Sequence, residues 1–95
     1  MEEKLKQLVE HYGFTNQADM LVEEAAEFTV ARNKLRRGNI EAIKQMEEEL
    51  ADVLVIALQL RLIIGKDYID DIMNKKIDRQ LIRMKEEKNN GSENT

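Results

Sequence analysis

The chain has 95 residues, a net charge of −4 and no cysteine. A chain of this length holds one small core, its acidic balance lacks the basic footprint of a nucleic-acid-binding protein, and the missing cysteines exclude disulfides, thiolate metal sites and cysteine nucleophiles. The composition has no proline or tryptophan and favours helix formers, which predicts an all-α protein.

The first residues, MEEKLKQLVEHYG, are acidic and amphipathic, unlike a secretory signal peptide. The most apolar segment, residues 50–64, contains Asp52, Gln59 and Arg61 and is shorter than the ~20 residues that cross a bilayer. We therefore expect a soluble, cytoplasmic protein that binds neither a membrane nor nucleic acid.

Periodicity and breaker residues divide the chain into four predicted helices. Apolar residues at i, i+3, i+4, i+7 spacing predict a first helix over about residues 2–12, which Gly13 ends. A second helix is predicted over about residues 16–37, with Thr15 or Asn16 as its N-cap.

The remaining chain predicts two further helices and a tail. A third helix, capped by Asn39, continues to Ile64, and a fourth covers about residues 68–87. Residues 1–88 are expected to form a single helical domain, whereas residues 89–95 are polar, lack apolar periodicity and are predicted to be disordered.

Four helices with short turns predict an antiparallel, four-helix bundle-like protomer. Residues 50–64 are apolar on nearly every side of the third helix, and a chain of this size is too short to wrap a helix completely. We therefore expect oligomerisation, as a homodimer or homotetramer, to complete the fold.

Two carboxylate pairs, each spaced i, i+3, border apolar helix faces. Glu49 and Asp52 share the arc of Ile56, and Glu24 and Glu27 lie beside the apolar stripe of the second helix. Since like charges gathered in a small space repel, such a cluster needs cations. Oxygen ligands without His or Cys favour Mg²⁺, with Mn²⁺ as a possible substitute, and Mg²⁺ commonly completes its shell with substrate phosphates.

Other interpretations compete with a metal site. Either acidic pair alone is more typical of a solvated helix face, and the two pairs together favour a site. A di-iron bundle is disfavoured, because such sites use Glu-x-x-His motifs and the one histidine, His11, has no place in one. On the fourth helix, Lys76, Arg79 and Arg83 form a basic arc that would bind phosphates or, equally, be a solvated flank.

At these acids the chain resembles the MazG-like all-α nucleoside triphosphate pyrophosphohydrolases. The family signature is Glu-Glu-x-x-Glu followed, after a spacer, by Glu-x-x-Asp. It is matched by EEAAE at residues 23–27 and ELAD at residues 49–52, with 21 residues between them. The resemblance covers roughly residues 17–83.

The resemblance implies Mg²⁺-dependent hydrolysis of a nucleoside triphosphate between the α and β phosphates, giving a nucleoside monophosphate and pyrophosphate, a nucleotide-pool house-cleaning activity. The metal-binding and catalytic residues that it implies are Glu24, Glu27, Glu49 and Asp52. Glu23, or one of the metal ligands, would orient the attacking water. The family often places Lys and Arg of its last helix on phosphates, which Lys76 and Arg79 match loosely.

The sequence leaves the substrate's base and sugar open. Phosphoribosyl-ATP pyrophosphatases and dimeric dUTPases share the acid motif, and no extra segment assigns the chain to either. One alternative is a non-catalytic helical oligomer that senses a nucleotide or binds a protein partner. Another is a structural oligomer in which the acids pair with Arg61, Arg79 or Arg83.

Overall fold

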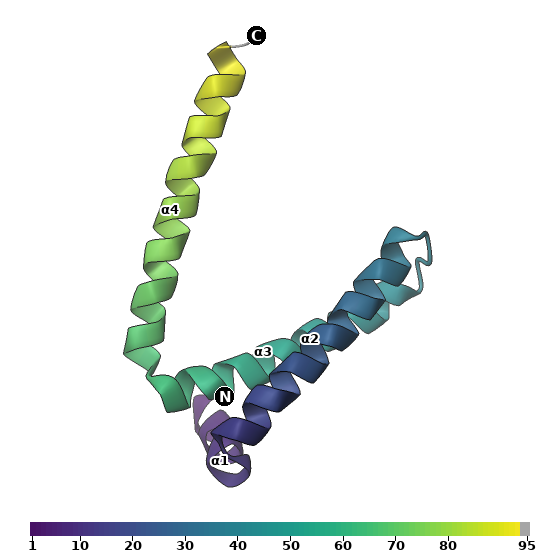
Figure 1. Cartoon of the computed structure of the whole chain (residues 1–95), viewed down its shortest axis with the longest axis vertical. Helices are drawn as coiled ribbons and strands as arrows, with labels where there is room; N and C mark the ends of the chain where they lie inside the picture. Colours follow the sequence, from purple (N-terminus) through teal and green to yellow (C-terminus); the bar gives the residue numbers. More distant parts are fainter. Residues whose placement is uncertain (94–95) are drawn as a thin grey trace. The chain divides into compact units, whose positions relative to one another are not determined.

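The computed structural model describes residues 1–93, which form helices joined by short turns, with no strand in this range (Figure 1). The elements are α1 (Glu2–Tyr12), α2 (Phe14–Arg36), α3 (Ala42–Ile64) and α4 (Lys66–Glu93). The predicted all-α fold class is confirmed. None of the helices in the described range combines the length and apolar character that a membrane span requires.

Two glycines set the turns on either side of α2. Gly13 is the single residue between α1 and α2, and its N–H donates to the carbonyl of Val9. Gly38 lies in the turn between α2 and α3. Their φ angles are 88° and 100°, a region that glycine enters without a steric penalty. The predicted ends of the first two helices are therefore close to the observed ones.

The starts of α2 and α3 differ from the predictions. α2 begins at Phe14, and Asn16 does not cap it, because the Asn16 Nδ2 donates to the carbonyl of Tyr12 at 2.8 Å. Asn16 thus satisfies an otherwise unpaired carbonyl at the end of α1. α3 begins at Ala42, since Ile40 lies in a turn and the Ala42 N–H donates to the carbonyl of Asn39.

α4 is longer than predicted at both ends. It begins at Lys66 and continues to Glu93, so residues 89–93 of the tail predicted to be disordered are helical. No proline interrupts the segment, and the good helix formers of residues 85–88 lead into it, so the helix continues through residues 89–92, which are poor helix formers and include Gly91. The last two residues of that tail, 94–95, lie outside the described range.

Contacts divide the chain into two units, Met1–Ile64 and the part from Gly65 onward. In the first unit α2 and α3 lie antiparallel and side by side, and α1 packs against both (Figure 1). The second unit is α4, which an exposed salt bridge of 3.0 Å between Lys75 and Asp71 supports weakly. The bundle-like packing of four helices stays a prediction.

α2 and α3 meet along a seam of side chains spaced alternately three and four residues apart. On α2 the seam consists of Gln17, Leu21, Glu24, Phe28, Ala31 and Leu35. On α3 it consists of Ala42, Met46, Glu49, Val53, Ile56 and Leu60. All of these side chains are buried or half-buried. The spacing is that of a coiled coil, and it places two glutamates and a glutamine where apolar residues are usual.

One polar pair crosses the seam. The Gln17 Nε2 donates to the Gln59 Oε1 at 2.7 Å, and the two side chains are only 8% and 2% exposed. A buried amide that loses its partner keeps the cost of desolvation without the compensating hydrogen bond. The pair therefore fixes how α2 and α3 align.

This pairing makes a double-mutant test possible. Gln59→Met is expected to lower the free energy of unfolding by about 1–3 kcal/mol, because it strands the Gln17 amide in the seam. Gln17→Met combined with Gln59→Met should recover much of that loss, since no buried donor is then unpaired. Urea denaturation of the single and double variants measures the coupling, and strictly additive losses would contradict it.

Candidate metal centre

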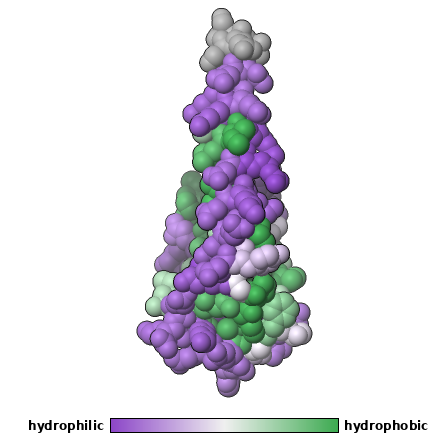
Figure 2. Space-filling view, turned by 90° about the vertical axis from the view of Figure 1, so that its left-hand side faces the viewer, coloured by the Kyte–Doolittle hydropathy of each residue, from purple (hydrophilic) through white to green (hydrophobic). Residues whose placement is uncertain are grey.

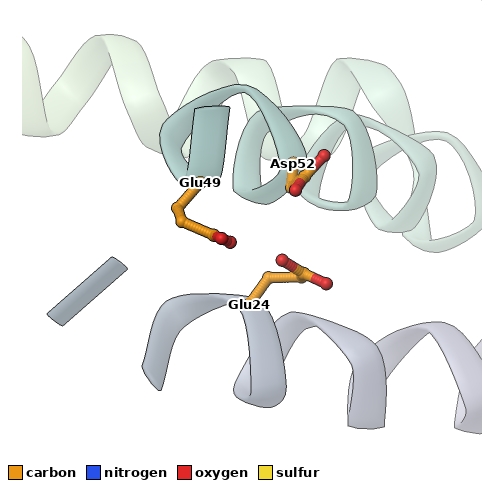
Figure 3. Close-up of side chains that lie close together, drawn as sticks. All are labelled: Glu24, Glu49 and Asp52. Atoms are coloured by element: carbon orange, nitrogen blue, oxygen red, sulfur yellow. The ribbon is translucent and has the colours of Figure 1, made fainter. Parts of the chain in front are cut away.

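Three carboxylates from two facing helices converge in the first unit. Glu24 on α2 and Glu49 on α3 point into the space between the helices, and Asp52 lies beside them on α3 (Figure 3). One oxygen of each lies within 4.8 Å of the other two. Glu24 and Glu49 are half-buried, whereas Asp52 is exposed. The cluster is therefore open to solvent on the Asp52 side.

The helix geometry explains why these side chains meet. Glu24 and Glu49 occupy seam positions, and Asp52 follows Glu49 by three residues, which keeps it on the same side of α3. Ile56 and Leu60 continue this side of α3 and are buried. The same packing that buries the apolar side chains thus forces the acids together.

The protein offers little compensation for the carboxylate charge. The Oε2 atoms of Glu24 and Glu49 are buried and accept a hydrogen bond from no described residue. A buried carboxylate oxygen without a donor is unfavourable unless a proton or a cation reaches it.

This environment raises the pKa values of Glu24 and Glu49. The pKa of Glu24 is raised to about 7, first because its protonated form shares a hydrogen bond with Glu49, then by desolvation and the charges of Glu27, Asp52 and Glu49. The shared hydrogen bond with Glu24 lowers the pKa of Glu49. Desolvation, hydrogen bonding with Glu27 and the charges of Glu27 and Asp52 raise it, and the net direction is upward. The two glutamates thus behave as one proton-sharing pair.

The donor set fits a hard divalent cation. Mg²⁺ holds oxygen ligands at ~2.0–2.1 Å, so opposite ligands lie ~4.2 Å apart. Among three ligands at most one pair is opposite, and adjacent ligands lie ~2.9 Å apart, so oxygens within 4.8 Å of one another would have to approach by side-chain rotation to share an ion. Three carboxylates without histidine or cysteine match the preference of Mg²⁺ and Mn²⁺ for oxygen.

Glu27, the fourth predicted ligand, lies on α2 one turn after Glu24 and is exposed. Its charge acts on both Glu24 and Glu49, so it borders the cluster. Glu23, predicted to orient water, is also an exposed residue of α2. The structure thus brings three of the predicted ligands together and places Glu27 beside them.

The predicted phosphate-binding residues Lys76, Arg79 and Arg83 are exposed on α4, in the second unit, and their role stays a prediction. The sequence interpretation missed the Gln17–Gln59 pair. Gln59 appeared there only as a polar residue in an apolar segment. Heptad spacing places Gln17 on the same face of α2 as Glu24, but it does not identify Gln59 as the partner.

Comparisons of the chain with protein-family models, with curated proteins and with solved structures found no match.

The raised pKa of Glu24 predicts how stability depends on pH in the presence of a chelator. Between the ordinary value of 4.5 and about 7, the folded chain keeps a proton that the unfolded chain has released. This stabilisation is complete below the lower value and is lost as the pH rises through the upper one. The free energy of unfolding should therefore fall from about pH 5 to about pH 8.

Urea denaturation at a series of pH values checks this expectation. Glu24→Gln should flatten the fall, because the titrating group is gone, whereas Glu48→Gln, at an exposed position of α3, should keep it. An identical fall in Glu24→Gln and in the wild type would show that the carboxylate cluster does not control it.

Proposed function

We propose that the chain is a Mg²⁺-dependent nucleoside triphosphate pyrophosphohydrolase. It would cleave between the α and β phosphates and release a nucleoside monophosphate and pyrophosphate. The observation that carries the proposal is the convergence of Glu24, Glu49 and Asp52 from two helices, with two buried oxygens that no described residue satisfies. The match of EEAAE and ELAD to the signature of the MazG-like enzymes supports the reaction type.

The roles of the residues follow from their places. Glu24, Glu49 and Asp52 would hold the metal, and Glu27 would join them by a side-chain rotation. Bound Mg²⁺ would neutralise phosphate oxygens and lower the pKa of a coordinated water. Glu23, exposed beside Glu24, would accept a hydrogen bond from the attacking water and orient it. The open side at Asp52 leaves room for the triphosphate.

A purely structural role for the acids is less well supported. In that role Arg61, Arg79 or Arg83 would pair with them across helix interfaces. Within the first unit, the buried oxygens of Glu24 and Glu49 accept no hydrogen bond. If the acids served only to hold the helices together, leaving them unpaired in the seam would lower the stability of the fold, and no interaction would compensate for the loss.

We also propose that a second copy of the chain completes the fold. The buried apolar core is small, and many large apolar side chains are exposed, Val22 at 71% and Ile40 at 77% among them. Figure 2 shows part of this surface as green patches between hydrophilic side chains. α4 alone has no partner helix within its unit for its apolar side chains. An oligomer in the cytoplasm, a homodimer or homotetramer, would cover such surfaces.

Pyrophosphate release tests the activity. The wild type with Mg²⁺ should release pyrophosphate and monophosphate from nucleoside triphosphates, and Asp52→Asn should reduce kcat/KM by about 100-fold or more, because it removes a metal ligand. Release of orthophosphate instead would contradict cleavage between the α and β phosphates. Glu48→Gln, which alters an acid outside the cluster, should leave the rate unchanged.

Thermal unfolding separates a metal site from a structural cluster. Mg²⁺ at about 100 times its Kd should stabilise the wild type by ~2.7 kcal/mol and raise its Tm, whereas Glu49→Gln should lose this shift. Nucleotide binding without turnover would indicate a nucleotide sensor instead of an enzyme.

Light scattering after gel filtration tests the oligomer. Ile43, Leu50 and Leu54 share the side of α3 opposite the carboxylates, and each is at least 45% exposed. Leu54→Lys should therefore lower the molar mass at a fixed concentration, while Glu48→Lys should not. A monomeric wild type would contradict the proposed assembly.

A further inference from the structure

An open cavity of about 530 Å³ lies in the first unit, near the junction of α1 and α2. Its lining residues are Tyr12, Asn16, Gln17, Asp19, Met20 and Ile56. Its size falls in the range of small-molecule sites. The metal centre uses none of these residues, and the sequence analysis assigned no function to this combination.

The cavity adjoins the carboxylate cluster along the groove between α2 and α3. Met20 precedes Glu24 by one helical turn on α2, and Ile56 follows Asp52 by one turn on α3. Because the helices are antiparallel, both steps run in the same direction, each by ~6 Å. A ligand with its phosphates at the carboxylates therefore has the cavity within reach of its nucleoside end.

The walls of the cavity suit a flat heteroaromatic ring. Tyr12 contributes an aromatic face, and Met20 and Ile56 contribute apolar surface. Thioether and aromatic side chains pack well against aromatic rings. These walls provide stacking and apolar contact, which every base accepts, so the polar groups decide the selectivity.

The polar groups of the cavity are mainly acceptors. The Asn16 Nδ2 donates one of its two N–H groups to the carbonyl of Tyr12, and the Asn16 Oδ1 can accept a hydrogen bond. Gln17 likewise donates to Gln59, which leaves its Oε1, and it is held rigidly because it is only 8% exposed. Asp19 adds a carboxylate. A cavity rich in acceptors complements a ligand that presents N–H donors.

We propose that this cavity is the nucleobase pocket of the enzyme, and that it selects bases with an exocyclic amino group over uracil and thymine. The inference rests on the proposed function for its substrate class. Adenine, cytosine and guanine would present an NH₂ group to the Asn16 and Gln17 oxygens, whereas uracil and thymine carry only carbonyl groups outside the ring and offer the single N3–H as a donor on that edge.

Nucleosides without phosphates test the pocket independently of metal and turnover. Millimolar adenosine or cytidine added to the full chain should shift the side-chain amide NMR signals of Asn16 and Gln17, and uridine should shift them much less. Met20→Trp fills the cavity and should abolish the shifts, while Val22→Trp, at an exposed position of the same helix, should preserve them. Asn16→Ala, a milder change, should weaken the preference for cytidine over uridine.

Kinetics then connects the pocket to the activity. We expect kcat/KM for ATP, CTP and GTP to exceed that for UTP by about tenfold or more, and this ratio to collapse in Met20→Trp. Absence of nucleoside-dependent shifts, or equal shifts with uridine, would overturn the pocket whether or not the chain releases pyrophosphate. Clear shifts without pyrophosphate release would overturn the proposed function and leave a base-binding cavity.

Discussion

Repulsion among carboxylates in the α2–α3 seam is the constraint on which the rest of the structure depends. The heptad spacing that buries Ile56 and Leu60 also places Glu24 and Glu49 between the helices, with Asp52 beside them. Two buried oxygens there accept no hydrogen bond from the described part of the chain, and the pKa of Glu24 rises to about 7. A divalent cation would relieve this conflict, whereas a single proton would relieve only part of it.

The distribution of polarity in the first unit follows from that constraint. Three of the seam positions carry polar groups, Gln17, Glu24 and Glu49, and Gln17 pairs with Gln59 one heptad away from Glu24. Apolar side chains such as Leu50 and Leu54 also lie on the outer side of α3. The polar groups in the seam therefore lower the stability of a single copy of the chain. We propose that assembly with a second copy compensates for this loss of stability.

Most helix bounds and the position of the acids could be predicted from the sequence, because helices place residues on a face at a regular spacing. The glycines marked helix ends, and i, i+3 spacing placed Glu49 and Asp52 on one face. The predicted start of α2 was wrong because the Asn16 side chain donates to the carbonyl of Tyr12 at the end of α1 instead of capping α2. Residue spacing does not decide between these two local hydrogen bonds. The Gln17–Gln59 pair depends on how two helices align across 42 residues of chain, and no local pattern records this alignment.

The most direct test of the account is Mn²⁺ binding followed by electron paramagnetic resonance, since Mn²⁺ accepts the same oxygen ligands as Mg²⁺. The signal of free Mn²⁺ should fall as wild-type protein is added and recover when Mg²⁺ competes. Glu24→Gln and Glu49→Gln should each remove the tight site, and Glu48→Gln should leave it intact. Equal Mn²⁺ binding by all of these proteins would contradict the claim that the seam carboxylates form a metal centre.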